Sequence, residues 1–252
     1  MCLVLVAWQQ DDALPLIVAG NRDEFHARLT EPLHWWSDKP QILAGRDLEA
    51  GGTWLAVGRN GRFATVTNFR DADHPQARFC SRGELVTGFI ESAAGPLEYL
   101  QSIDGARYAG FNLLVSDGER LAYASNRDGG RARELAPGLY GVANGGLDAP
   151  WHKTLVSKER MRQALSEGVD TDGLLALLDD RERGPDDDVS TAVPGFAEAG
   201  ALTAPFIVLP DYGTRSSTAV LLSNTGRIDI TERRFGPDGL QTGETRETFQ
   251  PA

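Results

Sequence analysis

The chain opens with Met1-Cys2-Leu3-Val4-Leu5-Val6-Ala7-Trp8, in which a cysteine at position 2 precedes an apolar, β-branched run that is typical of a buried strand. Removal of the initiator methionine would give Cys2 a free α-amine beside its thiol. Because an α-amine titrates at about 7.7 to 8.0 and a thiol at about 8.5, the amine can accept the thiol proton near neutral pH. This is the chemistry of an N-terminal-nucleophile hydrolase. The alternative is that Cys2 is only a small hydrophobic residue at the start of a strand.

A second apolar run over residues 14–20 follows a polar segment, and the two runs together are typical of an antiparallel hairpin. A turn near residues 11–12 pairs positions whose numbers sum to about 23 or 24 and places Cys2 opposite Asn21-Arg22-Asp23-Glu24. The arginine then favours the thiolate, and a carboxylate lies within reach of the α-amine. Asn21, Arg22 and Glu24 are therefore candidates for ligand binding. The alternative is an ordinary charged strand end at the surface.

The rest of the chain predicts an α+β fold in which two antiparallel sheets pack face to face with helices outside. Turns at residues 60–61, 117–118 and 225–226 separate apolar strands. Helices are expected after Ser81-Arg82-Gly83-Glu84, which has capping-box spacing, from about 148 to 165, and over 172–178, with Asp170 and Thr171 as cap candidates. The acidic stretch 181–201 is expected to be a long surface loop. We expect residues 1–252 to form one domain.

Composition narrows the class of protein. The 252 residues carry a formal net charge of −11, which argues against a nucleic-acid or anionic-membrane partner. Cys2 and Cys80 are the two cysteines, too few for a disulfide framework or a thiolate zinc cage, and they fit a reducing compartment. We expect no signal peptide, no integral membrane segment and a cytoplasmic protein. The four histidines show no metal-ligand spacing, so no metal is expected.

Three strand ends offer groups that could stabilise an oxyanion. Asn68 ends one strand, Asn144 ends another, and Tyr212-Gly213-Thr214-Arg215 precedes an apolar run. Removing a working amide donor from an oxyanion site costs about 2.7 to 4 kcal/mol. The alternative is that asparagine and glycine simply favour turns.

These segments together resemble the NRDE family, also called the transport and Golgi organisation protein 2 family. The resemblance spans nearly the whole chain in order, and its motifs are Met1-Cys2, Asn21-Arg22-Asp23-Glu24-Phe25, Gly51-Gly52-Thr53-Trp54-Leu55, Thr67-Asn68, Ser81-Arg82-Gly83-Glu84-Leu85-Val86, Gly110-Phe111-Asn112-Leu113, Asn144 with Pro150-Trp151, and Tyr212-Gly213-Thr214-Arg215. The resemblance implies an N-terminal-nucleophile-like αββα sandwich. It also implies a connection with haem trafficking and with lipid or acyl-coenzyme A metabolism.

The chain is also faintly similar to choloylglycine hydrolases and penicillin V acylases. That similarity implies Cys2 as nucleophile and base, Asp23 holding the α-amine, Asn68 and Asn144 serving the oxyanion or amine, and Arg215 supporting the nucleophile. In those acylases two residues separate the arginine from the aspartate of the second strand. Here the two are adjacent and should point to opposite faces unless a bulge intervenes.

Two hypotheses follow. The first is a cysteine N-terminal-nucleophile hydrolase that cleaves an amide or thioester of a small amphipathic molecule and requires no cofactor. The second is a non-catalytic carrier that holds haem or acyl-coenzyme A in the same pocket. The partner in either case is a small molecule, as substrate or as ligand.

Overall fold

The computed structural model describes residues 2–70, 80–127, 129–185 and 199–251, and two antiparallel sheets dominate it. The first sheet has the spatial order β10-β1-β2-β11-β12-β13. Its strands are β1 (Cys2–Trp8), β2 (Leu16–Phe25), β10 (Gly138–Val142), β11 (Tyr212–Leu222), β12 (Ile228–Phe235) and β13 (Gln241–Phe249).

The second sheet runs in sequence order from β3 to β9, and its one long connection, from β6 to β7, contains two helices. Its strands are β3 (Thr30–Trp35), β4 (Ile42–Asp47), β5 (Leu55–Gly58), β6 (Phe63–Asn68), β7 (Phe111–Ser116), β8 (Leu121–Ser125) and β9 (Arg133–Glu134). Gly61, Gly118 and Gly226 all have positive φ, so the three turns expected from the sequence occur where glycine can adopt that conformation.

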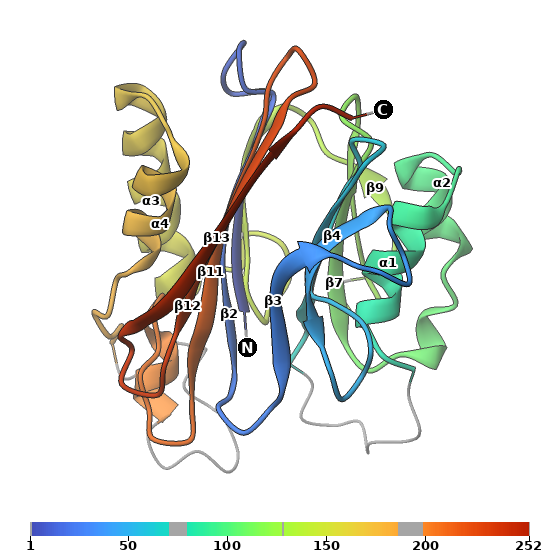
Figure 1. Ribbon diagram of the computed structural model, residues 1–252. Helices are drawn as coiled ribbons and strands as arrows, with labels where there is room; N and C mark the ends of the chain where they lie inside the picture. The colour runs from blue at the N-terminus through green and yellow to red at the C-terminus, as the bar shows by residue number, and fades with distance from the viewer. Residues whose placement is uncertain (1, 71–79, 128, 186–198, 252) are drawn as a thin grey trace.

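Helices cover the outer face of each sheet, which gives four layers (Figure 1). The helices are α1 (Gly83–Glu91), α2 (Pro96–Ser102), α3 (His152–Glu167) and α4 (Thr171–Leu178), with short 3-10 turns at Gly105–Arg107 and Ala199–Thr203. The pair α1 and α2 packs on the second sheet, and the pair α3 and α4 packs on the first. The predicted αββα sandwich of two antiparallel sheets is confirmed.

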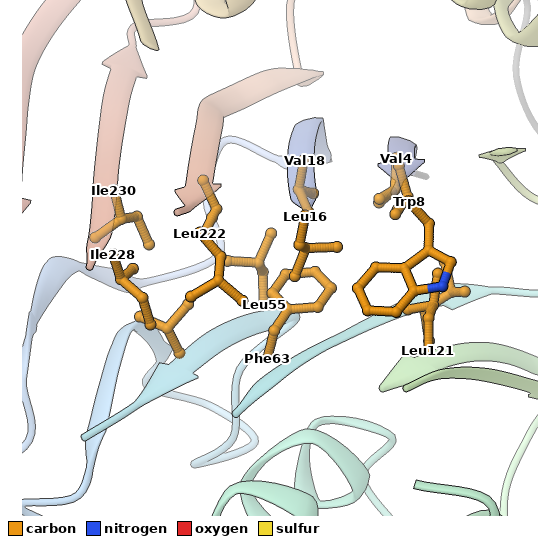
Figure 2. Close-up of a cluster of buried hydrophobic side chains, with 14 of the residues drawn as sticks. Val4, Trp8, Leu16, Val18, Leu55, Phe63, Leu121, Leu222, Ile228 and Ile230 are labelled. Carbon is orange, nitrogen blue, oxygen red and sulfur yellow. The ribbon is translucent and has the colours of Figure 1, made fainter. Parts of the chain in front are cut away.

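The space between the sheets is filled by apolar side chains over much of its length (Figure 2). β1 and β2 alternate strictly, as antiparallel strands between two layers should. Val4, Trp8, Leu16 and Val18 point inward to the other sheet, whereas Leu3, Leu5, Ile17 and Ala19 point outward to α3 and α4. Both faces are buried, which explains why the first strand reads as an uninterrupted apolar run.

The hairpin register is the one that the sequence predicts. Cys2 pairs with Arg22 and Trp8 pairs with Leu16, so every pair sums to 24. One end of β1 is therefore held beside the charged tetrad while its other end enters the apolar core.

The three helices expected from the sequence are present, but only one of the expected helix caps forms. Asp170 caps α4, since its side chain accepts a hydrogen bond from the Gly173 amide at 2.7 Å. The expected capping box at α1 is wrong, because Arg82 occupies the cap position and no side chain caps the helix. Helix α2 was not foreseen. In the stretch 181–201, residues 186–198 lie outside the described part, and Ala199–Thr203 forms a 3-10 turn in place of a loop.

Within the described ranges, no helix is long and apolar enough to cross a membrane.

Candidate active site

A cavity of about 650 Å³ opens between the sheets at the end where Cys2 lies. Both sheets and the start of α1 contribute to its wall. The lining includes Cys2, Arg22, Asp23, Glu24, Arg28, Asp47, Asn68, Cys80, Arg82, Arg127 and Glu232. Several arginines and several acidic residues therefore lie around one buried thiol.

Cys2 is the first residue of β1, and its side chain lies on the inner face with 8% of its surface exposed. Burial raises the pKa of the Cys2 thiol above its ordinary value, whereas the Arg22 cation and a backbone hydrogen bond from Asp23 lower it by less. The Arg22 cation thus favours the thiolate, as expected, although burial outweighs this effect and raises the pKa of the thiol overall. An attack by this thiol would therefore require a base.

Asp23 is held from every side although it is almost fully buried. Its Oδ1 accepts from the Thr214 hydroxyl at 2.8 Å, its Oδ2 lies 3.9 Å from Nζ of the fully buried Lys153, and its carbonyl accepts from the Tyr212 hydroxyl at 3.0 Å. Burial raises the pKa of the Asp23 carboxyl, and the Lys153 cation and the Thr214 hydrogen bond oppose that rise. The carboxylate is thus fixed in position.

The motif Tyr212-Gly213-Thr214 explains how β11 reaches Asp23. A Cβ on Gly213 would lie 2.6 Å from the Ile207 carbonyl oxygen, so only glycine allows this close approach. The Thr214 hydroxyl accepts from the Ile207 amide at 2.9 Å while it donates to Asp23. The motif is therefore a clamp on the end of β2.

Arg215 takes a different role from the one expected. The register between β2 and β11 shifts between Thr214 and Ser216, so Arg215 is the extra residue of a bulge. Its guanidinium donates to the carbonyls of Phe25, His26 and Arg28 at 2.9 to 3.1 Å and does not line the cavity. Arg215 holds the turn after β2, and its expected support of the nucleophile is corrected accordingly.

Asn68 and Asn144 are brought together, but only Asn68 lines the cavity. The Asn144 amide donates to the Asn68 carbonyl at 2.7 Å and so fixes the end of β6. The Asn144 Oδ1 is buried with no hydrogen-bond partner among the described residues. The Asn68 side chain is half-buried and hydrogen-bonds to no described residue, which leaves its amide available to a ligand.

The tetrad divides by strand alternation. Arg22 faces the cavity, donates to Thr30 at 3.3 Å and lies 3.5 Å from Asp47, and Glu24 also lines the cavity. Arg22 and Asp23 do point to opposite faces, as their adjacency requires. Asn21 does not reach the cavity, because it is buried on the outer face and donates to the carbonyls of Leu178 and Pro205. Its assignment to ligand binding is therefore wrong.

Sequence reasoning missed two residues of this site. Lys153 is wholly buried beside Asp23, although a lysine on a helix is normally a surface residue and gave no signal. Arg82 was noticed only as part of a capping motif. A cation at the positive end of a helix is electrostatically unfavourable, and that conflict was the available signal.

The two glycine motifs meet at the cavity wall. A Cβ on Gly52 would lie 2.8 Å from the Gly83 carbonyl carbon, and a Cβ on Gly83 would lie 2.8 Å from the Thr53 amide nitrogen. The segment before β5 and the start of α1 can approach this closely only because both glycines lack a side chain. This contact brings Arg82 to the cavity.

A known protein family matches almost the whole chain. The family described as "Transport and Golgi organisation 2" matches residues 1–237. The chain belongs to this family. The "Transport and Golgi organization protein 2 homolog" of Homo sapiens is 33% identical over 272 residues, covering 98% of this chain and 97% of the human protein. The Bos taurus homolog is 32% identical over 275 residues, covering 99% of both chains. The Drosophila melanogaster protein is 26% identical over 246 residues, covering 88% of this chain and 87% of its own.

Two solved structures share the fold of this family member at 9% identity. The Caenorhabditis elegans N-acylethanolamine-hydrolyzing acid amidase ortholog has a TM-score of 0.52 and covers 87% of this chain and 92% of its own. The C2A mutant of conjugated bile acid hydrolase from Clostridium perfringens has a TM-score of 0.54. The match covers 99% of this chain and 97% of the hydrolase chain. The fold is therefore that of N-terminal-nucleophile-type hydrolases.

Proposed function

We propose that this protein is a cysteine N-terminal-nucleophile hydrolase that cleaves an amide or thioester of a small amphipathic molecule. The observation that carries the proposal is the position of the Cys2 thiol and the open Asn68 amide in one cavity, with the Asp23 carboxylate clamped on the opposite face of β2 behind them. Nucleophile, orienting anion and oxyanion donor are the three roles that acyl transfer requires.

The proposed reaction begins after cleavage of the bond between Met1 and Cys2. The α-amine takes the thiol proton as sulfur attacks the substrate carbonyl, and the Asn68 amide stabilises the oxyanion. Collapse of the intermediate breaks the carbon–nitrogen or carbon–sulfur bond, and the ammonium returns its proton to the leaving group. Water then attacks the acyl-enzyme with the amine as base, which releases a carboxylic acid and restores the thiol. Asp23 orients the ammonium throughout.

The surroundings of the cavity support an amphipathic substrate. Phe25, Leu29 and Leu48 are 49%, 65% and 50% exposed. Each is next in sequence to a residue that lines the cavity, and Leu29 and Leu48 are joined by a backbone hydrogen bond. Exposed apolar side chains beside a charged cavity fit a molecule with an apolar tail and a polar reacting end.

A carrier of haem or acyl-coenzyme A is the second candidate. The observation that favours it is the cavity of about 650 Å³ itself, bordered by the exposed apolar side chains of Phe25, Leu29 and Leu48. Such a protein would use the cavity for binding without covalent chemistry.

The test compares wild type with Cys2→Ala and with Cys80→Ala, the other thiol at the cavity. Palmitoylethanolamide, a glycine-conjugated bile acid and palmitoyl-coenzyme A serve as substrates, and haem and palmitoyl-coenzyme A serve as ligands. A hydrolase loses product formation in Cys2→Ala, keeps it in Cys80→Ala and binds substrate in both. If wild type cleaves none of the three while wild type and Cys2→Ala bind haem or palmitoyl-coenzyme A equally tightly, the protein is a carrier.

A further inference from the structure

Arg82 differs from Arg22 and Arg28, two other arginines of the cavity wall, in what it contacts. Arg28 donates to Asp47 at 2.6 Å, and Arg22 lies 3.5 Å from the same carboxylate. Arg82 instead donates to the Gly110 carbonyl at 3.1 Å and forms no ion pair with any described residue. A guanidinium has five N–H donors, so most of those on Arg82 remain free for a ligand.

The position of Arg82 is costly and is not explained by local stability. It occupies the cap of α1, where the helix dipole favours anions and where no side chain satisfies the first amides. Burial lowers the pKa of Arg82, although the guanidinium stays protonated. A half-buried cation without a carboxylate partner is expensive unless a bound anion completes it.

An anion bound to Arg82 would lie in the same cavity as the Cys2 sulfur. Arg82 and Cys2 line the same cavity, and the close contact between Gly52 and Gly83 fixes the helix start that carries the arginine. The cavity wall already includes the acidic residues Glu24, Asp47 and Glu232. A dianionic phosphate would meet this negative charge, whereas a single carboxylate is balanced by one guanidinium in a bidentate pair.

We propose that Arg82 is the anchor of a subsite for a substrate carboxylate, so that the molecule cleaved at Cys2 carries a carboxylate close to its scissile carbonyl. This inference rests on the proposed function in taking Cys2 as the reacting atom. It narrows the substrate to acyl amides or acyl thioesters whose leaving group or acyl part is a monoanion near the reaction centre.

Two alkylating agents of nearly equal size test the subsite without a known substrate. Iodoacetate carries a carboxylate and iodoacetamide is neutral, and both transfer their carbon to sulfur with loss of iodide. The ratio of their rates at Cys2, read by peptide mass mapping and divided by the same ratio for N-acetylcysteine, reports anion attraction alone. In wild type we expect this normalised ratio to exceed one despite the net charge of −11.

Variants of Arg82 and of a control arginine show whether Arg82 causes the raised ratio. Arg82→Gln should lower the ratio about fivefold, as one partly screened charge contact predicts, with the iodoacetamide rate little changed. Arg82→Lys should retain most of the ratio. Arg120→Gln, which removes an exposed arginine paired with Asp117 outside the cavity, should leave it unchanged. A wild-type ratio at or below one, or an equal fall in Arg120→Gln, overturns the subsite. Because alkylation requires no turnover, absence of hydrolysis in the panel above would leave this result standing and would count against the proposed function alone.

Discussion

The two ends of the space between the sheets are built from the same strands but differ in character: one end is an apolar core and the other is a cavity lined by charged residues. At one end Trp8 and Leu16 pair and pack with Phe63 in a dry core (Figure 2). At the other end Cys2 and Arg22 pair at a cavity lined by charges. The apolar end makes the sandwich stable, which lets the cavity end retain groups that reduce stability.

The cost at the cavity end is visible in particular atoms. The Asn144 Oδ1 is buried with no partner among the described residues, and the Asp23–Lys153 pair is wholly desolvated. Buried ion pairs seldom repay their desolvation in full. The two ends therefore differ in what their buried groups contribute: apolar contacts stabilise the fold at one end, and polar groups that reduce stability gather at the other.

The largest expected effect is on stability, at the dry end. Phe63→Ala removes a ring that is 2% exposed between the sheets, and it should lower the free energy of unfolding by about 3 to 5 kcal/mol. Turnover per folded molecule should stay close to wild type. Urea denaturation with activity measured below the transition checks both, and Leu240→Ala, at an exposed site, serves as the control. Loss of turnover in fully folded Phe63→Ala would break the separation between the ends.

Asn68→Ala should show the reverse pattern. Without the open amide, turnover should fall by about 10² to 10³, as for other single oxyanion donors, while stability changes by less than about 1 kcal/mol. Steady-state rates and denaturation on the same sample measure the two quantities. Asn224→Ala, an exposed asparagine that contacts the Asp12 carbonyl, is the matched control. A variant that unfolds readily but turns over normally would make Asn68 a structural residue.

Thr214→Val should act on the pH profile. The hydroxyl donates to the charged form of Asp23, so its loss raises the pKa of a carboxyl that burial has already raised. Because Asp23 must be ionised to hold the ammonium, activity that is lost on acidification should be lost at a pH roughly one unit higher. Rates above that range should change little. Thr218→Val, on the same strand, should keep the wild-type profile, and an unshifted acidic limb in Thr214→Val would contradict the assigned role of Asp23.

Arg215→Gln should give the smallest effect. The guanidinium contacts three carbonyls of the turn after β2, so its loss should cost about 1 kcal/mol of stability and leave turnover within about twofold. Thermal denaturation and a rate measurement suffice. A fall in turnover of a hundredfold or more with intact stability would restore the catalytic role expected from acylase similarity.

The sequence was sufficient for features that depend on periodicity. The position of one turn determined that Cys2 faces Arg22, and strand alternation placed Arg22 and Asp23 on opposite faces. The same alternation could have removed Asn21 from the ligand-binding set. Burial of a charge cannot be read from periodicity, so Lys153 was missed. A bulge displaces one residue without any local signal, so Arg215 was misplaced.

In the proposed reaction, Cys2 attacks as an N-terminal residue with its own amine as base. Intact-mass spectrometry of protein quenched during turnover of palmitoyl-coenzyme A, followed by peptide mapping, tests it most directly. We expect a palmitoyl adduct on Cys2, present only in molecules that begin with Cys2 and absent from Cys2→Ala. Fully active protein that retains Met1, or an adduct formed equally when Met1 is retained, would contradict it.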